Sequence, residues 1–444
     1  MMKIVIIGNG VAGVTAARHI RKLSDNEITI ISSETDHFFS RTALMYIYMG
    51  HLTYEQTKPY EDFFWKKNKI DLVKGYVNKI DFDSKKLELT NSSSYKYDVL
   101  IIATGSKSNK FGWSGQDLDG VQGLYNINDL HLLENNTVGI NHSVVVGGGL
   151  IGIELVEMLH SRHIPVTFIV RENSYMSNLL PKEEGSLIYR HILDHKIDIR
   201  METELDEIIP DENGKVRGVT LKNGEFIECQ FVGLTVGVSP NINFLIDSGI
   251  KINRGILVNE YLETNIKDVY ALGDCAELDF HRDHLPKIEQ LWYTSKMQGE
   301  TVAKTICGNR TIYNRGILFN SAKFLDIEWH TYGLVLNSLR ENENSLYWEN
   351  KKGDKCFRIN FWEHSKVVTG MNCFGIRHRH KIWEDWLHKN YTIEKILSEL
   401  KSANFDPEFF KSFESEIVKL YNHNNTNSKI ELKKVGSIFS RILK

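Results

Sequence analysis

The first fourteen residues, MMKIVIIGNGVAGV (residues 1–14), decide how the rest of the chain is interpreted. The apolar run Ile4–Ile7 predicts a strand buried on both faces, as in a parallel sheet. The residues after Val14 predict a helix, and between strand and helix lies the spacing G-x-G-x-x-G. A strand, a Gly-rich turn and a helix in this order are the context in which that spacing indicates a dinucleotide site.

Each glycine has a separate expected role. Gly8 permits a tight turn, Gly10 lets backbone N–H groups approach a pyrophosphate, and Gly13 lets the helix pack closely on the strand. The phosphate charge then faces the positive end of the helix. A second strand, Ile28–Ile31, ends near Glu34, and a carboxylate there can accept hydrogen bonds from both ribose hydroxyls of an adenosine.

Composition and charge narrow the class of protein. A chain of 444 residues favours two or three domains, and 41% hydrophobic with 25% charged residues is typical of a globular protein. A net charge of −3 argues against nucleic-acid binding. The five cysteines are widely spaced and never form C-x-x-C, which indicates reduced thiols. With no room for a signal peptide and no apolar run near the ~20 residues of a membrane span, we expect a cytoplasmic protein.

The opening pattern occurs twice. Ser143–Val146 is followed by Gly147-Gly148-Gly149-Leu150-Ile151-Gly152, then by a helical pattern and the strand Val166–Val170. Between the two repeats, a buried strand ends in Ala103-Thr104-Gly105, whose small residues suit close approach of a ligand. Two such units in one chain predict a protein that holds two dinucleotides together, and hydride transfer between them is the economical reason to do so.

These motifs resemble the FAD-dependent pyridine nucleotide-disulfide oxidoreductase superfamily. Val236–Asn241 is similar to the return crossing from its NAD(P) domain, Thr264–Asp274 to its second flavin motif, and Lys287–Gly299 to the helix behind the flavin. The resemblance covers about residues 1–310. It implies an α/β fold with two Rossmann-like nucleotide-binding domains, one for FAD and one for NAD(P), plus a C-terminal α+β interface domain. The implied bounds are 1–105 with 254–310 for FAD, 106–253 for NAD(P), 311–410 for the C-terminal domain and 411–444 for a helical, basic tail.

The resemblance also implies the residues of both sites; Asp274 is expected to bind the flavin ribityl chain. The expected FAD-binding residues are Gly8, Gly10, Val11, Ala12, Gly13, Glu34, Ser40, Arg41, Val77, Ala103, Thr104, Gly105, Gly273, Asp274, Glu289, Gln290 and Leu291. The expected NAD(P)-binding residues are Gly147, Gly149, Leu150, Ile151, Gly152, Glu154, Arg171 and Gly237. No metal site is predicted, and the His-rich segment Ile376–His380 is interpreted as a solvated surface segment with no carboxylate or thiolate cluster beside it.

The chain departs from the superfamily where the electron acceptor is decided. It has no cysteine before Cys229, so neither the redox disulfide nor the single reactive cysteine of other members is available. Ser40–Leu44 looks instead like the arginine-containing segment of rubredoxin, ferredoxin and nitrite-reductase flavoproteins. Tyr46 stands where those proteins usually have a lysine that pairs with the glutamate matching Glu154. We hypothesise that Arg41 or solvent compensates, and we count Glu154 and Arg41 as the catalytic candidates.

The predicted reaction is hydride transfer from NAD(P)H to FAD and electron delivery to an external acceptor: a redox protein, a quinone or oxygen. Glu154, expected in the first turn of the second nucleotide helix, would orient the nicotinamide; its alternative role is a favourable charge near a helix N-terminus. The alternative function is a flavoprotein that binds NAD(P)H as a redox sensor or scaffold with little turnover. Trp292 and Tyr293 stand where type II NADH dehydrogenases, which use quinones, usually have an Ala-Gln pair.

Two further features leave alternatives open. After the strand that ends at Val170, Arg171 could bind the 2′-phosphate of NADPH, whereas Glu172 could bind the ribose of NADH; we favour NADPH. The tail Lys433–Lys444 has the pattern of a short basic amphipathic helix. Such a stripe could contact a membrane, but more often it docks on its own protein or a partner subunit, which we favour. The superfamily's C-terminal domain often mediates dimers, so a homodimer is one expectation.

Overall fold

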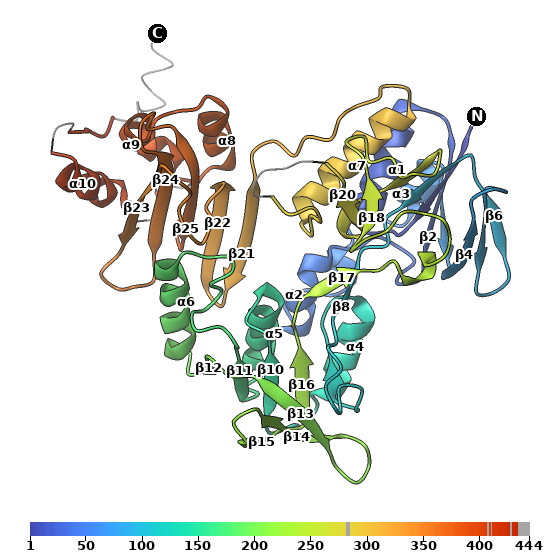
Figure 1. Cartoon of the computed structure of the whole chain (residues 1–444), viewed down its shortest axis with the longest axis horizontal. Coiled ribbons are helices and arrows are strands. Elements are labelled where there is room, and N and C mark those ends of the chain that lie inside the picture. The colour runs from blue at the N-terminus through green and yellow to red at the C-terminus, as the bar shows by residue number, and fades with distance from the viewer. Residues whose placement is uncertain (281–284, 406–407, 410, 427–428, 434–444) are drawn as a thin grey trace. The chain divides into compact units, whose positions relative to one another are not determined.

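The computed structural model describes residues 1–280, 285–405, 408–409, 411–426 and 429–433. The chain forms two compact units, shown in Figure 1. Unit 1 contains Met1–Ile169 and Thr203–Arg315, and unit 2 contains Val170–Glu202 and Gly316–Lys444. Each unit has its own apolar core, so each is described by itself.

The opening residues of the chain form the centre of a five-stranded parallel sheet in unit 1. Its strands lie in the order β19-β7-β1-β2-β3. Their bounds are β1 (Lys3–Ile7), β2 (Glu27–Ser32), β3 (Ile70–Lys74), β7 (Val99–Ile102) and β19 (Val269–Ala271). The aliphatic run of β1 is buried on both faces, as the sequence predicts. Since β19 pairs with β7, segments far apart in the sequence complete one sheet.

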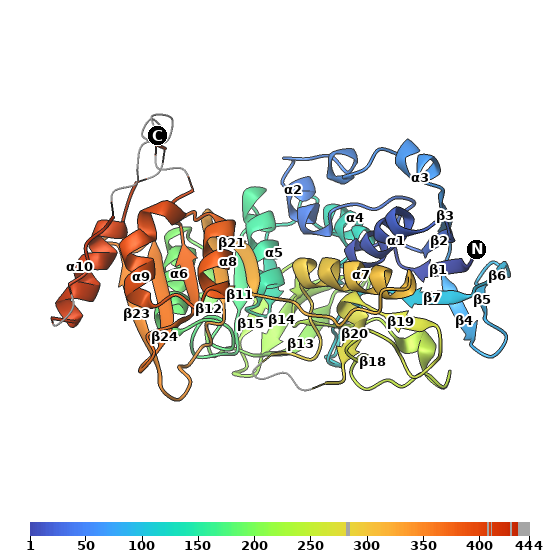
Figure 2. The same cartoon turned by 90° about the horizontal axis from the view of Figure 1, so that it is seen from above.

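Two helices from opposite ends of unit 1 pack beside this sheet. Helix α1 (Val11–Leu23) lies along α7 (Trp292–Ile306), as Figures 1 and 2 show. The contact is close because α7 carries Gly299, where a Cβ atom would lie 2.7 Å from the carbonyl oxygen of Ala12. The N-termini of both helices therefore lie at the carboxyl ends of the strands, which is where ligands bind in open α/β sheets.

The second glycine motif belongs to another parallel sheet of unit 1. Its strands within this unit lie in the order β11-β10-β16-β9. Their bounds are β9 (Val121–Gln122), β10 (Ser143–Val146), β11 (Val166–Ile169) and β16 (Phe231–Leu234), and helix α5 (Leu150–Ser161) follows β10. The unit β10-α5-β11 thus repeats the order of β1-α1-β2.

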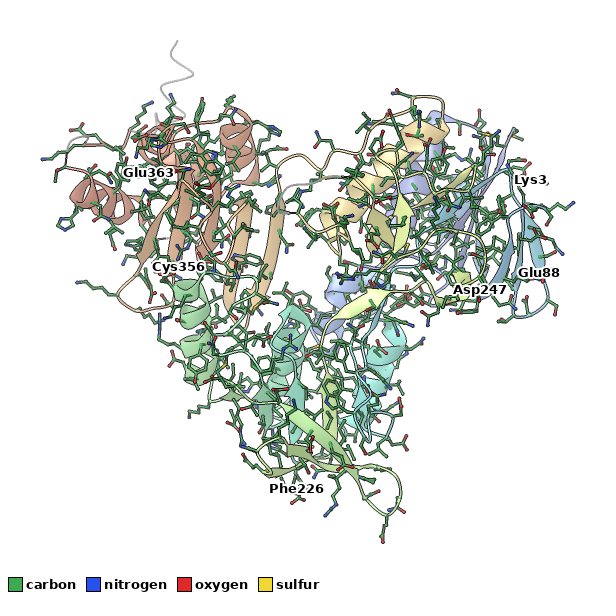
Figure 3. The ribbon with its side chains drawn as sticks, in the orientation of Figure 1. Lys3, Glu88, Phe226, Asp247, Cys356 and Glu363 are labelled. Carbon is green, nitrogen blue, oxygen red and sulfur yellow. The ribbon has the colours of Figure 1, made fainter. Side chains whose placement is uncertain are left out.

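Shorter elements complete unit 1. The antiparallel sheets are β4 (Val77–Asp81), β5 (Lys86–Leu89) and β6 (Ser94–Lys96), and β13 (Leu205–Pro210), β14 (Val216–Leu221) and β15 (Phe226–Glu228). Phe226, labelled in Figure 3, is an exposed residue at the start of β15. Two-stranded pairs are β8 (Ser106–Ser108) with β17 (Val238–Pro240), and β18 (Ile256–Val258) with β20 (Ala276–Leu278). The remaining helices are α2 (Leu44–Tyr48), α3 (Phe63–Lys67) and α4 (Ile127–Asn136).

Unit 2 is built on an antiparallel sheet in the order β21-β22-β25-β24-β23. The strands are β21 (Phe319–Phe324), β22 (Ile327–Gly333), β23 (Glu343–Glu349), β24 (Cys356–Trp362) and β25 (Val368–Phe374). Side chains alternate between faces along a strand. On β24, Phe357, Ile359 and Phe361 pack in one core with residues of α8 (His380–His388), α9 (Ile393–Glu399) and α10 (Glu414–Asn424).

The other face of β24 is polar and meets a helix from the 170–202 segment. This segment contains α6 (Lys182–Asp194) and β12 (Asp198–Arg200). Buried Arg358 donates to Glu184 at 2.7 Å and to Glu183 at 2.6 Å, while Asn372 of β25 donates to Glu184 at 2.7 Å. Breaking such a buried pair from one side costs several kcal/mol. The same face carries Cys356, labelled in Figure 3. These bonds hold α6 on the sheet, where Figure 2 shows it.

The predicted fold class is confirmed: parallel nucleotide-binding sheets are followed by a C-terminal α+β part. The three-domain boundaries remain a prediction, because the compact units group 170–202 with the C-terminal residues instead. Among the residues described, no helix is both long enough and apolar enough to cross a membrane. The predicted basic helix of the tail falls almost wholly on 434–444, outside the described residues.

Candidate functional site

The first glycine turn has the geometry that the sequence predicts. Gly8 has a φ of +112°, and a Cβ there would lie 2.1 Å from the carbonyl oxygen of Ala103 at the end of β7. A Cβ on Gly13 would lie 2.2 Å from the carbonyl oxygen of Gly8. Gly10, the N-cap of α1, has no atom within 4 Å of a built Cβ. Two glycines are thus required by the chain itself, and the third leaves space open at the helix N-terminus.

The second turn repeats this geometry. Gly147 has a φ of +110°, and its built Cβ lies 2.5 Å from the carbonyl oxygen of Thr235 at the end of β16. A Cβ on Gly152 would lie 2.1 Å from the carbonyl oxygen of Gly147, whereas Gly149 again has nothing within 4 Å. Leu150 and Ile151 begin α5, as Val11 and Ala12 begin α1. Both glycine turns therefore have the same backbone geometry.

Hydrogen bonds from two polar side chains that are not specified by the glycine motif hold the turns in place. Asn9 donates to the carbonyl oxygen of Thr35 at 2.8 Å and accepts from Ser32 at 2.9 Å, which ties the first turn to the end of β2. Thr235 donates to the carbonyl oxygens of Val146 and Gly147, at 2.9 and 3.0 Å. Sequence reasoning missed both, since the motif allows any residue at the position of Asn9 and Thr235 lies far along the chain.

Glu34 lies where the first sheet predicts the adenosine ribose, but its carboxylate is already engaged. Both oxygens accept from the Arg41 guanidinium, at 3.0 and 2.6 Å, and Oε1 also accepts from the backbone N–H of Ile127 at 3.0 Å. A carboxylate offers about four acceptor positions, so about one remains. The prediction that Glu34 holds both ribose hydroxyls stays a prediction, and with these partners in place the second hydroxyl would have to displace Arg41 or Ile127.

Arg41, predicted to compensate for the lysine that Tyr46 replaces, has its described partners elsewhere. Its guanidinium also donates to the carbonyl oxygen of Tyr125 at 2.7 Å and lies 4.7 Å from the centre of that ring. These contacts place it at the predicted adenosine end of the site, between Ser40 and Thr42, whose hydroxyls bond with each other. Arg41 thus forms its ion pair with Glu34 and not with Glu154, which leaves solvent as the other predicted compensation. A catalytic role for Arg41 stays a prediction.

Tyr125 links the two ends of the predicted flavin site. Its hydroxyl donates to Asp274 at 3.2 Å and accepts from the backbone N–H of Ser106 at 2.9 Å. Ser106 also donates to Asp274 at 3.3 Å and accepts from Gln290 at 3.0 Å. Burial raises the pKa of Asp274 despite these donors. Tyr125 was not predicted; the capping box of α4, Asn126 with Asp129, fixes it in place.

The other predicted flavin residues lie on the same elements. Gly105 has a φ of +67° beside the Tyr125 hydroxyl, Thr104 donates to the carbonyl oxygen of Asn241 at 2.8 Å, and Val77 is buried at the start of β4. Gly273, with a φ of +74°, donates its N–H to Gln298 at 2.7 Å. Leu291 is the N-cap of α7. Their contacts with a cofactor stay predictions.

The side chain of Glu289 serves the protein itself. It is 1% exposed and accepts from Tyr313 at 2.6 Å, Arg315 at 3.1 Å and Gln298 at 3.3 Å. Gln298 in turn holds Gly273. The buried Glu289–Arg315 pair therefore anchors the segment that leads into α7, and a contact of Glu289 with a cofactor stays a prediction.

Glu154 is the fifth residue of α5, one position beyond the first turn where the sequence places it. The carboxyl is mostly buried, and burial, with the like charge of Glu157, raises its pKa to about 7. Among the described residues, no cation forms an ion pair with it. Helix α2, which carries Tyr46, packs against α5. A carboxyl that titrates near neutrality beside a nucleotide-binding turn is a candidate functional group.

Two predicted nucleotide residues lie beyond the second turn. Gly237, with a φ of +91°, accepts the backbone N–H of Asn109 at 3.0 Å. Arg171, in unit 2, is 78% exposed and donates to Glu172 at 3.1 Å. A surface pair of this kind contributes little to stability, and the role of Arg171 at a nucleotide stays a prediction.

The residues of unit 1 fit two dinucleotides. At each turn, one glycine position opens into unfilled space at a helix N-terminus, and the glycines on either side are closed by backbone contacts. Such a concavity of N–H groups suits a pyrophosphate. The buried Asp274 network offers an acceptor and several donors for the hydroxyls of a ribityl chain.

Comparison with known proteins gives the family. Residues 2–299 match the family described as pyridine nucleotide-disulphide oxidoreductase. A nitrite reductase [NAD(P)H] of Bacillus subtilis is 30% identical over 374 residues, which are 83% of this chain and 44% of that protein. A rubredoxin-NAD(+) reductase of Acinetobacter baylyi is 28% identical over 320 residues, 70% of this chain and 80% of that one. The chain spans less than half the length of the first two curated relatives.

A solved structure shows the same fold. The NAD-dependent persulfide reductase of A. fulgidus superposes with a TM-score of 0.83 at 22% identity, covering 96% of this chain and 84% of that one. The family match covers the two glycine turns, the Ala103–Gly105 segment and the region of Asp274 together. The predicted family is confirmed, and the chain belongs to the pyridine nucleotide-disulphide oxidoreductase family.

Proposed function

We propose that the chain is an FAD-dependent NAD(P)H oxidoreductase that passes electrons to an external acceptor without a redox-active cysteine. The observation that carries the proposal is the repeated turn geometry, two cradles for a pyrophosphate in one compact unit. FAD, when bound, would supply the chemistry of hydride and electron transfer. Both curated relatives described above are named as NAD(P)-linked reductases.

The chain's own residues would bind and orient. Gly8, Gly10 and Gly13 would hold the flavin pyrophosphate and Asp274 the ribityl hydroxyls, while Gly147, Gly149 and Gly152 would hold that of NAD(P)H. Glu154 would orient the nicotinamide by accepting a hydrogen bond. Such a reaction needs little acid–base machinery, because accurate placement of the two rings supplies most of the rate.

The cysteines support an external acceptor. Cys275, next to Asp274, is fully buried and its thiol contacts the carbonyl oxygens of Ile102 and Leu272. Burial raises its pKa, so the reactive thiolate is disfavoured. The acceptor class that we favour is a small redox protein, because the rubredoxin-NAD(+) reductase aligns with most of both chains.

The function is tested by anaerobic stopped-flow reduction of the flavoprotein with NADPH and with NADH. Rapid bleaching of the visible flavin band, followed by rapid return of colour with rubredoxin, ferredoxin, a quinone or oxygen, is the expected result and gives the acceptor class. A protein that cannot be loaded with FAD would contradict the proposal.

The second candidate is a redox sensor with little turnover. It is favoured by one observation: no described cation pairs with Glu154, so the nicotinamide side of the site lacks the charge balance expected of an efficient reductase. A long-lived charge-transfer band after reduction, with slow reoxidation by every acceptor, would support this candidate over the reductase.

Arg171→Ala is expected to raise the KM for NADPH roughly tenfold or more and to leave the KM for NADH unchanged, because a charge-assisted bond to the 2′-phosphate is lost. The measurement is steady-state kinetics with both nucleotides. Glu172→Gln is the matched control, since removing the charge of Glu172 should change the KM for NADH only if Glu172 binds the ribose of NADH. An equal effect of Arg171→Ala on both nucleotides would remove the preference for NADPH.

A further inference from the structure

Three metal-ligating side chains converge in unit 2, on residues that the proposed reaction does not use. His191 Nε2 lies 2.5 Å from Oδ1 of Asp326, and His195 Nε2 lies 3.4 Å from the same oxygen. One ligand atom from each of the three residues falls within 4.8 Å of the other two. Two imidazole nitrogens and a carboxylate oxygen therefore lie close enough together to bind one ion.

The sequence explains why these groups meet. His191 and His195 are four residues apart, so they share one face at the C-terminal end of α6, where their rings lie 4.5 Å apart. Asp326 comes from the two-residue turn Leu325-Asp326 that joins β21 to β22. Leu325 is buried with a φ of +57°, and Asp326 is left 74% exposed and directed at the two rings.

The hydrogen bonds select the ligand form of His195. Its Nδ1 lies 2.9 Å from the carbonyl oxygen of His191, and a carbonyl oxygen only accepts. Nδ1 must therefore carry the hydrogen, so in the neutral ring the lone pair is on Nε2, the atom that faces Asp326. A ring nitrogen fixed by a bond from the other nitrogen to a backbone carbonyl is the common arrangement of histidine metal ligands.

We propose that His191, His195 and Asp326 bind one divalent transition-metal ion of the zinc class. Imidazole nitrogens with one carboxylate favour Zn²⁺ and its neighbours over Mg²⁺ or Ca²⁺, which take oxygen ligands. With metal–ligand bonds of about 2.0–2.1 Å, tetrahedral donor atoms stand about 3.4 Å apart. His195 and Asp326 already meet that spacing, and the exposed Asp326 reaches it from His191 by withdrawing about 1 Å. Water would fill the fourth position.

The site is preorganised by contacts that need no metal. Glu184 and Glu183 fix one end of α6 to Arg358, and Arg190 donates to Glu349 of β23 at 2.5 Å. The histidine pair is thus held opposite the β21–β22 turn before any ion arrives. A bound ion would then cross-link the C-terminal end of α6 to the β21–β22 turn within unit 2.

The test uses the full-length flavoprotein, stripped of metal with a chelator and titrated with Zn²⁺ by calorimetry. The expected result is one tight equivalent, a raised unfolding temperature with Zn²⁺, and slower hydrogen exchange in 182–196 and 324–328. The double variant His191→Ala/His195→Ala and, separately, Asp326→Asn are each expected to weaken this site roughly tenfold or more. Asp326→Asn guards against misfolding, since Asp326 is exposed, and it should leave flavin reduction unchanged.

The matched control is His364→Ala/His388→Ala, which removes two exposed histidines of the same unit. This control variant should still bind one equivalent of Zn²⁺ tightly. The proposal is overturned if wild-type protein shows no tight equivalent, or if the control and the His191→Ala/His195→Ala variant bind Zn²⁺ equally, which would mean adventitious binding to surface histidines. Failure of flavin reduction in every protein, with Zn²⁺ binding intact, would count against the proposed reductase and leave the metal site standing.

Discussion

Gly149→Ala is expected to weaken NAD(P)H binding at least about tenfold while the protein folds normally and keeps its flavin. Gly149 is the N-cap of α5 with a φ of −78° and a ψ of −176°, a conformation that alanine adopts without strain. A Cβ there meets no protein atom within 4 Å, so the chain itself has no need of glycine. The added methyl group would instead occupy the space into which we place the pyrophosphate of NAD(P)H.

The neighbouring glycine gives the opposite expectation. In Gly152→Ala, the new Cβ would lie 2.1 Å from the carbonyl oxygen of Gly147, and neither backbone segment can yield without moving α5 from its sheet. Such overpacking destabilises by about 1–3 kcal/mol or more. The expected result is a lower unfolding temperature or no soluble protein. The Gly149→Ala variant therefore tests ligand binding, and the Gly152→Ala variant tests the stability of the fold.

The duplicate turn supplies the control for Gly149→Ala. Gly10→Ala is equally free of contacts and should lower FAD content and visible absorbance, while nucleotide binding measured by calorimetry is retained. Gly149→Ala should do the reverse. The measurements are flavin content per chain, the KM and dissociation constant for each nucleotide, and thermal unfolding. If Gly149→Ala leaves both nucleotide constants unchanged, the second turn is not the NAD(P)H site.

The two turns could be predicted because their requirements are local. Only glycine tolerates a φ near +110° or a backbone contact closer than any Cβ allows. These requirements therefore place glycines at fixed positions in the sequence. Asn9, Thr235 and Tyr125 serve the same site but satisfy it through partners far along the chain. Each uses an ordinary polar side chain in a position with no fixed spacing, so no pattern marked them.

The histidines also show that a sequence pattern does not reveal partners from distant parts of the chain. His378 lies in a segment interpreted as solvated, yet it is 6% exposed and accepts a hydrogen bond from Trp383 at 3.0 Å, and burial lowers its pKa to about 3. That interpretation holds for the exposed Arg377, Arg379 and His380 and is wrong for His378, because the alternating arginines conceal one buried position. His191 and His195 drew no attention, since their carboxylate partner, Asp326, arrives from a distant hairpin.

Glu154→Gln is expected to raise the free energy of unfolding at pH 8 by about 3 kcal/mol, with a much smaller change at pH 5. Burial and the like charge of Glu157 raise the pKa of Glu154 to about 7, from 4.5 in the unfolded chain. The folded state therefore holds a proton that the unfolded state releases, and stability falls as the pH rises from about 4.5 through 7. Glutamine stays neutral and removes this loss.

The control for this stability effect is Glu157→Gln. It removes the like charge beside Glu154 and should therefore lower the pKa of Glu154. The stability lost as the pH rises through that pKa should then become smaller than in wild type. Urea unfolding between pH 5 and pH 8 measures both variants. Identical pH dependence in wild type and Glu154→Gln would mean that Glu154 is ionised in the folded protein without penalty.

The same residue should control the rate of flavin reduction. Glu154→Leu removes the acceptor for the nicotinamide amide, and because a displacement of about 1 Å costs roughly 100-fold in rate, reduction should slow by about that factor. Glu154→Gln keeps an acceptor oxygen and should stay within about tenfold of wild type. In wild type the rate should rise with pH through about 7 as the carboxylate forms, and the glutamine variant should show no such step. A leucine variant as fast as wild type would leave Glu154 with a purely structural place in α5.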